Sequence, residues 1–141
     1  MKFICFDIGN KRIGVAVSDP FMSMALPKET FFRKNFESDL VALSDLAKKE
    51  GADRIVCGLP LNVDGTERQQ TKLTRSFIDA LKKVTDIPIV TADERYSTLE
   101  ARRILIERDV RREKRKNYVD SIAASFILED YINKLKNSGE I

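Results

Sequence analysis

Two apolar runs joined by a short polar turn are the feature that most constrains the fold. Residues 3–6 (FICF) are continuously apolar, which is typical of a strand buried on both faces. In residues 13–18 (IGVAVS) apolar side chains alternate with small ones, and the GNKR between the runs predicts a hairpin turn. We therefore expect two paired antiparallel strands, the first of which ends at an acid, Asp7.

Helical patterns and short apolar runs alternate after this hairpin. A third strand is expected within residues 24–32, with boundaries weakened by Pro20 and Pro27. Two further strands are expected from Arg54 and Ile87, each preceded by an amphipathic helix. This order predicts an α/β fold, a mixed five-stranded sheet flanked by helices, with three antiparallel strands and two parallel strands reached by crossovers.

The helix boundaries are expected from local signals. The first helix should end at Gly51, and T-x-x-Q or S-x-x-E capping boxes at residues 66–69 and 97–100 should begin the next two. The third helix should continue to about Arg108, and the last should span residues 118–136.

Length and composition indicate one globular unit. The 141 residues fit a single domain, and no apolar run approaches the roughly 18 residues of a membrane span. No signal-type leader is recognisable, so we expect a cytoplasmic protein without a membrane partner. The two cysteines, Cys5 and Cys57, lie inside strand-like runs and are expected to be free and buried.

The chain contains no histidine. This excludes serine-histidine and cysteine-histidine nucleophile systems and removes the commonest zinc ligand. Carboxylates, lysines, arginines and hydroxyls remain, and this set suits Mg²⁺ or Mn²⁺ rather than zinc.

Three acids are expected at one end of the sheet. Asp7 and Glu94 fall at the carboxyl ends of expected parallel strands, where sites form in open α/β sheets. Asp120 lies on the last helix, on the face it shares with Ala123 and Ala124, so it must be paired, protonated or bound to a cation. Taken singly, these acids can shape a turn, pair with an arginine or cap a helix. Together they repel one another, and two divalent ions roughly 4 Å apart would relieve that repulsion and support phosphodiester hydrolysis.

A basic segment precedes Asp120. Residues 102–116 hold eight Lys or Arg against three acids, a net charge of +5, whereas the rest of the chain carries −2. Such a cluster favours a polyanionic partner through counterion release, although a solvated loop would have the same composition.

Four motifs in order resemble the YqgF/RuvX family. They are DIGNKRIGVAVSDP from Asp7, GLPLNVDGT from Gly58, ADERYST from Ala92 and RREKRKNYVDSIAASFIL from Arg111. Members of this family resemble Holliday junction resolvases and are described as nucleases that process the 5′ end of precursor 16S ribosomal RNA. The resemblance implies a ribonuclease H-like fold and a metal-dependent active site whose acids fall on Asp7, Glu94 and Asp120.

Other residues of these motifs are candidates for substrate binding. The guanidinium groups of Arg12 and Arg95 match phosphate oxygens, and the loop from Gly58 to Thr66 leads into a helix whose free amides can hold a phosphate. The basic residues just ahead of Asp120 would guide a polyanion toward the acids; they are Lys114, Arg115 and Lys116. Alternatively Arg12 only pairs with an acid, and Gly58 only shapes a turn.

The residues together with the resemblance therefore predict a hydrolase acting on ester bonds, a Mg²⁺- or Mn²⁺-dependent endonuclease with two ions. Its expected substrate is structured RNA, the 5′ end of precursor 16S ribosomal RNA that the resemblance implies. Cleavage of four-way DNA junctions is the main alternative, because neither a metal site nor a basic segment reads bases. A non-catalytic nucleic-acid-binding module is a second alternative. An ATPase that clasps nucleotide between two such domains fits less well, because this chain supplies one. Monomer and homodimer both stay open.

Overall fold

The structure is a computed structural model of residues 1–141. It describes residues 1–62, 64–95 and 112–141, and at residues 94–95 and 112–119 it describes the backbone alone. The strands are β1 (Phe3–Ile8), β2 (Arg12–Ser18), β3 (Ala25–Pro27), β4 (Phe31–Phe32), β5 (Arg54–Leu61) and β6 (Ile89–Arg95). The helices in this part of the chain are α1 (Phe36–Lys49), α2 (Gln69–Val84) and α4 (Arg112–Asn137). The helix predicted to begin at residues 97–100 lies outside the described residues.

One mixed sheet organises the chain, with the strand order β3-β2-β1-β5-β6. The strands β1 and β2 form the predicted antiparallel hairpin, and β5 and β6 add to the other side of β1 as parallel strands. Because α1 precedes β5 and α2 precedes β6, each parallel strand is reached through a helix. The predicted α/β class, with its antiparallel unit and its two crossover strands, is confirmed.

The third strand differs from the prediction, because two short strands replace it and the sheet has six strands. Just after β3 the N–H of Lys28 still donates to the carbonyl of Val15 at 2.7 Å, but the backbone N–H of Val15 donates to the Ser121 hydroxyl of α4, at 3.1 Å. The hydroxyl of Thr30, which lies between β3 and β4, forms a hydrogen bond with the same Ser121 hydroxyl at 3.1 Å. A serine from the far end of the chain therefore fills the break in the sheet edge.

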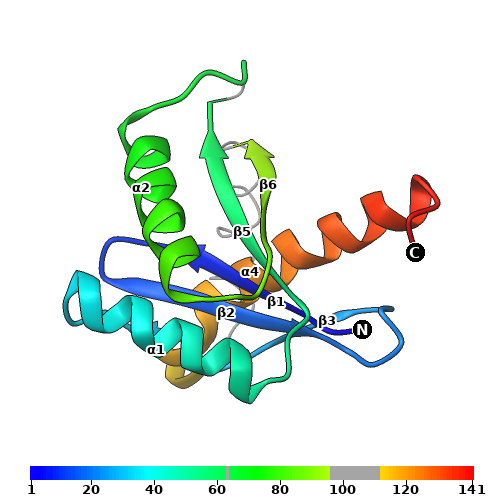
Figure 1. The fold of residues 1–141 in the computed structure, drawn as a ribbon, viewed down its shortest axis with the longest axis horizontal. Coiled ribbons are helices and arrows are strands. Elements are labelled where there is room, and N and C mark those ends of the chain that lie inside the picture. The colour runs from blue at the N-terminus through cyan, green and yellow to red at the C-terminus, as the bar shows by residue number, and fades with distance from the viewer. Residues whose placement is uncertain (63, 96–111) are drawn as a thin grey trace.

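Helices cover both faces of the sheet (Figure 1). On one face, Ile4 and Phe6 of β1 pack with Leu43 of α1 and Phe77 of α2. On the other face, Phe3 and Cys5 of β1 pack with residues of α4, among them Ala123, Ala124 and Ile127. The two sides of β1 thus belong to two separate hydrophobic clusters, and α4 alone among the described helices contributes to the second.

The predicted start of α2 is wrong by two residues, because the expected capping box makes Thr66 the N-cap, whereas the N-cap is Arg68. The helix begins at Gln69, because Oδ1 of Asp64 accepts hydrogen bonds from both the backbone N–H and the hydroxyl of Thr66, at 2.9 and 2.6 Å. Thr66 therefore belongs to the turn that precedes the helix. Thr71 caps the start of α2 instead, because its hydroxyl accepts a hydrogen bond from the backbone N–H of Arg68 at 3.1 Å.

One further helix boundary agrees with the prediction, the end of α1, and one differs, the start of α4. The first helix ends as predicted, with Gly51 in the left-handed region at φ +70° just after its last turn. The last helix begins at Arg112, earlier than the predicted residue 118, so the basic residues 114–116 are helical rather than part of a loop.

The two cysteines, Cys5 and Cys57, form no disulfide with each other and both are buried, as predicted. Burial raises the pKa of the Cys57 thiol to about 12, so it stays protonated and unreactive at neutral pH. No helix in the described part of the chain is long and apolar enough to span a bilayer.

Candidate active site

Asp7 lies on the face of β1 that α4 covers. Phe3 and Cys5 pack in the α4-side cluster, and alternate residues of a strand share a face, so Asp7 follows them. In the register of the hairpin its Cα lies opposite that of Gly14 on β2. The side chain is partly buried at the edge of the core.

Asp120 reaches the same glycine from the helix. A Cβ added to Gly14 would lie 2.0 Å from the carbonyl oxygen of Asp120, so only glycine permits the helix backbone to approach the strand this closely. Asp7 and Asp120, which are far apart in sequence, therefore flank one residue of β2. The small residues Ala123 and Ala124, which are fully buried, continue this close contact along the helix.

The carboxylate of Asp120 is partly buried, and its negative charge is only partly compensated. Its side chain is 18% exposed, and its Oδ2 lies 3.1 Å from Nε of Arg12. This contact is an ion pair without hydrogen-bond geometry, since the buried Oδ2 accepts no hydrogen bond within the described residues. Arg12 itself is 48% exposed, so the pair lies at the protein surface with its arginine accessible to a ligand.

Glu94 lies at the same end of the sheet, on β6. Its Cα pairs with Pro60 of β5, and β5 separates it from β1, which places the backbones of β1 and β6 about 10 Å apart. The side chains of Glu94 and of Arg95 lie outside the described part of the structure. The structure thus joins Asp7 to Asp120 around Gly14, whereas the predicted contribution of Glu94 stays a prediction.

These residues suit a hard divalent cation. Carboxylate oxygens are the ligands that Mg²⁺ and Mn²⁺ prefer. A buried carboxylate oxygen without a hydrogen bond, as in Asp120, is an atom whose lost hydration a cation would replace. Among the described side chains, which do not include that of Glu94, no group of three Asp, Glu or Cys could hold a metal ion.

The glycine and threonine predicted to bind substrate have local structural roles. A Cβ on Gly58 would lie 2.8 Å from Cδ1 of Ile127, so this glycine lets α4 pack against β5. The hydroxyl of Thr66 is held within its turn, where it accepts a hydrogen bond from Nδ2 of Asn62 at 3.0 Å and donates to Asp64. These contacts explain why a glycine and a threonine occupy these two positions, and their part in substrate binding stays a prediction.

The basic residues lie on the helix that carries Asp120. Lys114, Arg115 and Lys116 belong to the first turns of α4, and Lys116 precedes Asp120 by one turn, about 6 Å along the axis. Their side chains lie outside what the structure describes. A continuous helix nevertheless fixes the backbone of residues 114–116 relative to that of Asp120.

A family model described as "RuvX: Holliday junction resolvase" matches residues 1–134. The chain belongs to the RuvX family. A protein of Halothermothrix orenii named "Putative pre-16S rRNA nuclease" is 44% identical over 133 residues, which cover 94% of this chain and 95% of that protein. A Clostridium acetobutylicum protein with the same name is 42% identical over 135 residues, 96% of this chain and 100% of its own.

Solved structures support the fold of this RuvX chain. The Holliday junction resolvase of fowlpox virus matches with a TM-score of 0.56 at 20% identity, covering 96% of this chain and 100% of its own. RuvC of T. thermophilus, solved with a Holliday junction substrate, matches with a TM-score of 0.57 at 9% identity and covers 96% of each chain. The ribonuclease H-like fold implied by the motifs is therefore confirmed.

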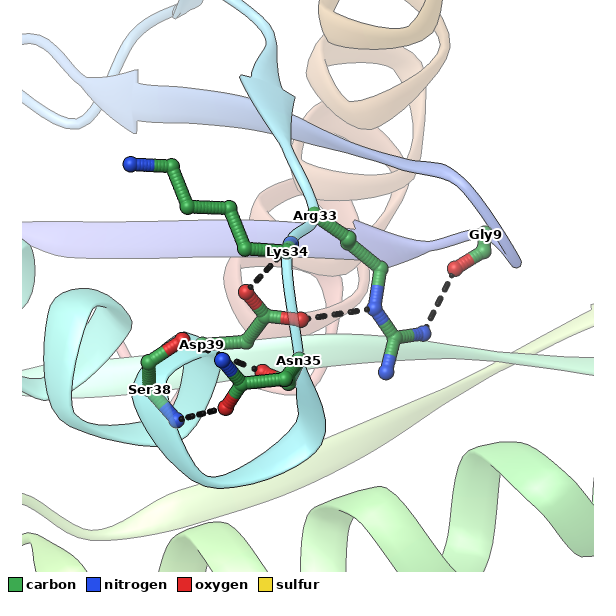
Figure 2. A network of polar contacts seen from close by, with 6 residues as sticks. All are labelled: Gly9, Arg33, Lys34, Asn35, Ser38 and Asp39. Carbon is green, nitrogen blue, oxygen red and sulfur yellow. Dashed lines mark hydrogen bonds and ion pairs between the residues drawn. The ribbon is translucent and has the colours of Figure 1, made fainter.

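One polar network of the RuvX chain escaped the sequence analysis (Figure 2). Arg33 donates from Nη1 to the carbonyl oxygen of Gly9 at 2.8 Å and from Nε to Oδ2 of Asp39 at 3.1 Å. The other oxygen of Asp39 accepts the backbone N–H of Lys34 at 2.9 Å. Because Gly9 comes two residues after Asp7, this network fixes the turn that follows the candidate acid.

Replacing Arg33 by methionine should destabilise the protein strongly. Asp39 is 1% exposed, so the substitution leaves a buried carboxylate with its charge unpaired, at a cost of about 3–5 kcal/mol. Urea denaturation would measure this loss. The Arg33→Met/Asp39→Asn double variant should recover a large part of it, and equal stability of the single and double variants would contradict this account.

Proposed function

We propose that this chain is a divalent-metal-dependent endonuclease that hydrolyses phosphodiester bonds, and that its substrate is the 5′ end of precursor 16S ribosomal RNA. The observation that carries the proposal is the meeting of Asp7 and Asp120 at Gly14, with Arg12 beside them. The names of relatives above 40% identity over nearly the whole chain support the choice of RNA.

In this proposal the acids hold the metal and the cations hold the substrate. Asp7, Asp120 and Glu94 would ligate Mg²⁺ or Mn²⁺, most simply as two ions. When bound, such ions activate water and stabilise the leaving oxygen of a phosphodiester. Arg12, which is half exposed and next to Asp120, would contact a phosphate of the substrate. Residues 1–141 would form a single nuclease domain.

Cleavage of four-way DNA junctions is the second candidate. It is favoured by the description of the matching family model and by the resolvase fold. Phosphate contacts do not separate RNA from DNA, so the two candidates share one site. A resolvase would also need a symmetric dimer to cut two strands, a requirement that the rRNA nuclease does not share.

Purified protein with Mg²⁺ or Mn²⁺ should cut precursor 16S RNA near its 5′ end, and EDTA should abolish the cut. The physical reason is that carboxylates alone cannot offset the charge that develops on the phosphate. Gel mapping of labelled RNA would measure the product, with junction DNA assayed in parallel at the same salt concentration because affinity depends on it.

Two outcomes would redirect the proposal. Faster cleavage of the junction than of the RNA would favour the resolvase. Binding of RNA that is unchanged by EDTA, without hydrolysis under any metal, would favour a non-catalytic binding module.

A further inference from the structure

Phe32 is a half-exposed aromatic residue on the short strand β4. Its neighbour Phe31 packs against the cluster that α1 and α2 cover. Because successive residues of a strand point to opposite faces, Phe32 lies on the α4 side of the sheet. There its exposed fraction is 50%.

The sheet register makes Phe32 the direct neighbour of Arg12. The Cα atoms of these two residues are paired between β4 and β2. The next pair along is hydrogen-bonded, since the N–H of Arg33 donates to the carbonyl of Lys11 at 2.9 Å. Arg12 and Phe32 therefore form a non-hydrogen-bonded pair, the kind in which Cα atoms lie about 4.5 Å apart and side chains are closest. The ring thus adjoins the pair of Arg12 and Asp120.

Packing within the described residues does not explain this ring. Two pairs of aromatic rings occur there, Phe3 with Tyr131 and Phe36 with Phe77. Two arginines lie over rings, but these rings are Phe77 and Phe3. Neither kind of contact involves Phe32 among the described residues. An apolar surface next to a candidate phosphate-binding arginine is therefore left open to a ligand that has both an aromatic face and a phosphate.

We propose that Phe32 is a stacking platform for an unpaired nucleobase of the substrate. The inference rests on the proposed nuclease function and deepens it. Arg12 would contact a backbone phosphate, and the adjoining base would lie on the ring of Phe32. A base inside a duplex has both faces covered by its neighbours, so the substrate strand must be single-stranded or splayed where it meets this site.

The test compares two short oligonucleotides with and without bases. Oligouridylate and an abasic analogue of equal length carry the same phosphates, so only stacking and base contacts separate their affinities. The wild-type protein should bind oligouridylate about 5- to 150-fold more tightly, the range expected for stacking of one base. Phe32→Ala should bring this ratio close to one while leaving the affinity for the abasic strand unchanged, and Phe32→Trp should preserve the ratio. Fluorescence anisotropy in EDTA measures both affinities.

Phe21→Ala provides the matched control. Phe21 is 87% exposed and follows the opposite end of β2, about 20 Å from Arg12, so its removal should leave the ratio at the wild-type value. The proposal is overturned if the wild-type protein binds both strands with equal affinity or binds neither. It is also overturned if Phe32→Ala keeps the wild-type ratio of affinities. The readout needs no cleavage, so a failure of stacking is distinguishable from a failure of nuclease activity.

Discussion

Replacing Asp120 by asparagine should lower the rate of RNA cleavage by about 10³-fold or more while leaving the fold intact. Asparagine has nearly the same shape but no charge, so it removes a metal ligand without creating a cavity. A metal ion contributes several kcal/mol of transition-state stabilisation, and each 1.36 kcal/mol corresponds to a factor of ten in rate. Asp7→Asn should have a similar effect, because both acids flank Gly14.

Stability measurements separate this catalytic role from a structural one. Within the described residues, Asp120 pairs with the half-exposed Arg12 and its buried Oδ2 accepts no hydrogen bond, so neutralising the carboxylate should change the free energy of unfolding by less than about 1 kcal/mol. Asp45→Asn is the control for loss of an acid, since Asp45 is exposed on α1, on the other side of the sheet. Undiminished cleavage by Asp120→Asn would exclude Asp120 as a metal ligand.

The sequence was sufficient where the determining interactions are local. The hairpin follows from alternation around a polar turn, and the end of α1 follows from Gly51, whose φ of +70° glycine adopts without strain. The apolar face of the last helix placed Asp120 beside Ala123 and Ala124, and all three now lie against the sheet. Residue type and periodicity carried this information without any knowledge of distant contacts.

Features that depend on distant contacts could not be predicted. The break between β3 and β4 depends on Ser121, which takes the N–H of Val15 across most of the chain length. The network of Arg33 and Asp39 is close in sequence, but its role appears only when the carbonyl of Gly9 is in place. The sequence offered only an acid, Asp39, directly before the apolar position Leu40, and its burial is seen only in the structure.

Gly14 is the residue on which the geometry of the candidate site most depends, and Gly14→Ala should be severely damaging. The new Cβ would lie 2.0 Å from the carbonyl oxygen of Asp120 and 3.0 Å from the backbone nitrogen of Ser121, where 3.4 Å is the beginning of ordinary contact. Both neighbours are backbone atoms of α4, so relief requires the helix to move away. That movement breaks the hydrogen bond from Val15 to Ser121 and displaces Asp120 from Arg12. We expect a loss of about 3 kcal/mol or more in unfolding free energy, together with loss of cleavage.

Gly58→Ala is the matched comparison, because it adds the same methyl group under the same helix. Here the Cβ meets a side-chain atom, Cδ1 of Ile127, at 2.8 Å, and a side chain can rotate or be shortened. The cost should be about 1–2 kcal/mol, and Gly58→Ala/Ile127→Val, which deletes that Cδ1, should recover most of it in urea denaturation. No shortened side chain can relieve the clash in Gly14→Ala.

The double variant also tests the role of Gly58 in substrate binding. If it regains stability but not cleavage, Gly58 contributes to substrate binding beyond packing; if both return, its role is packing alone. Equal destabilisation by the two single variants would contradict the distinction between backbone and side-chain contacts on which the site model rests.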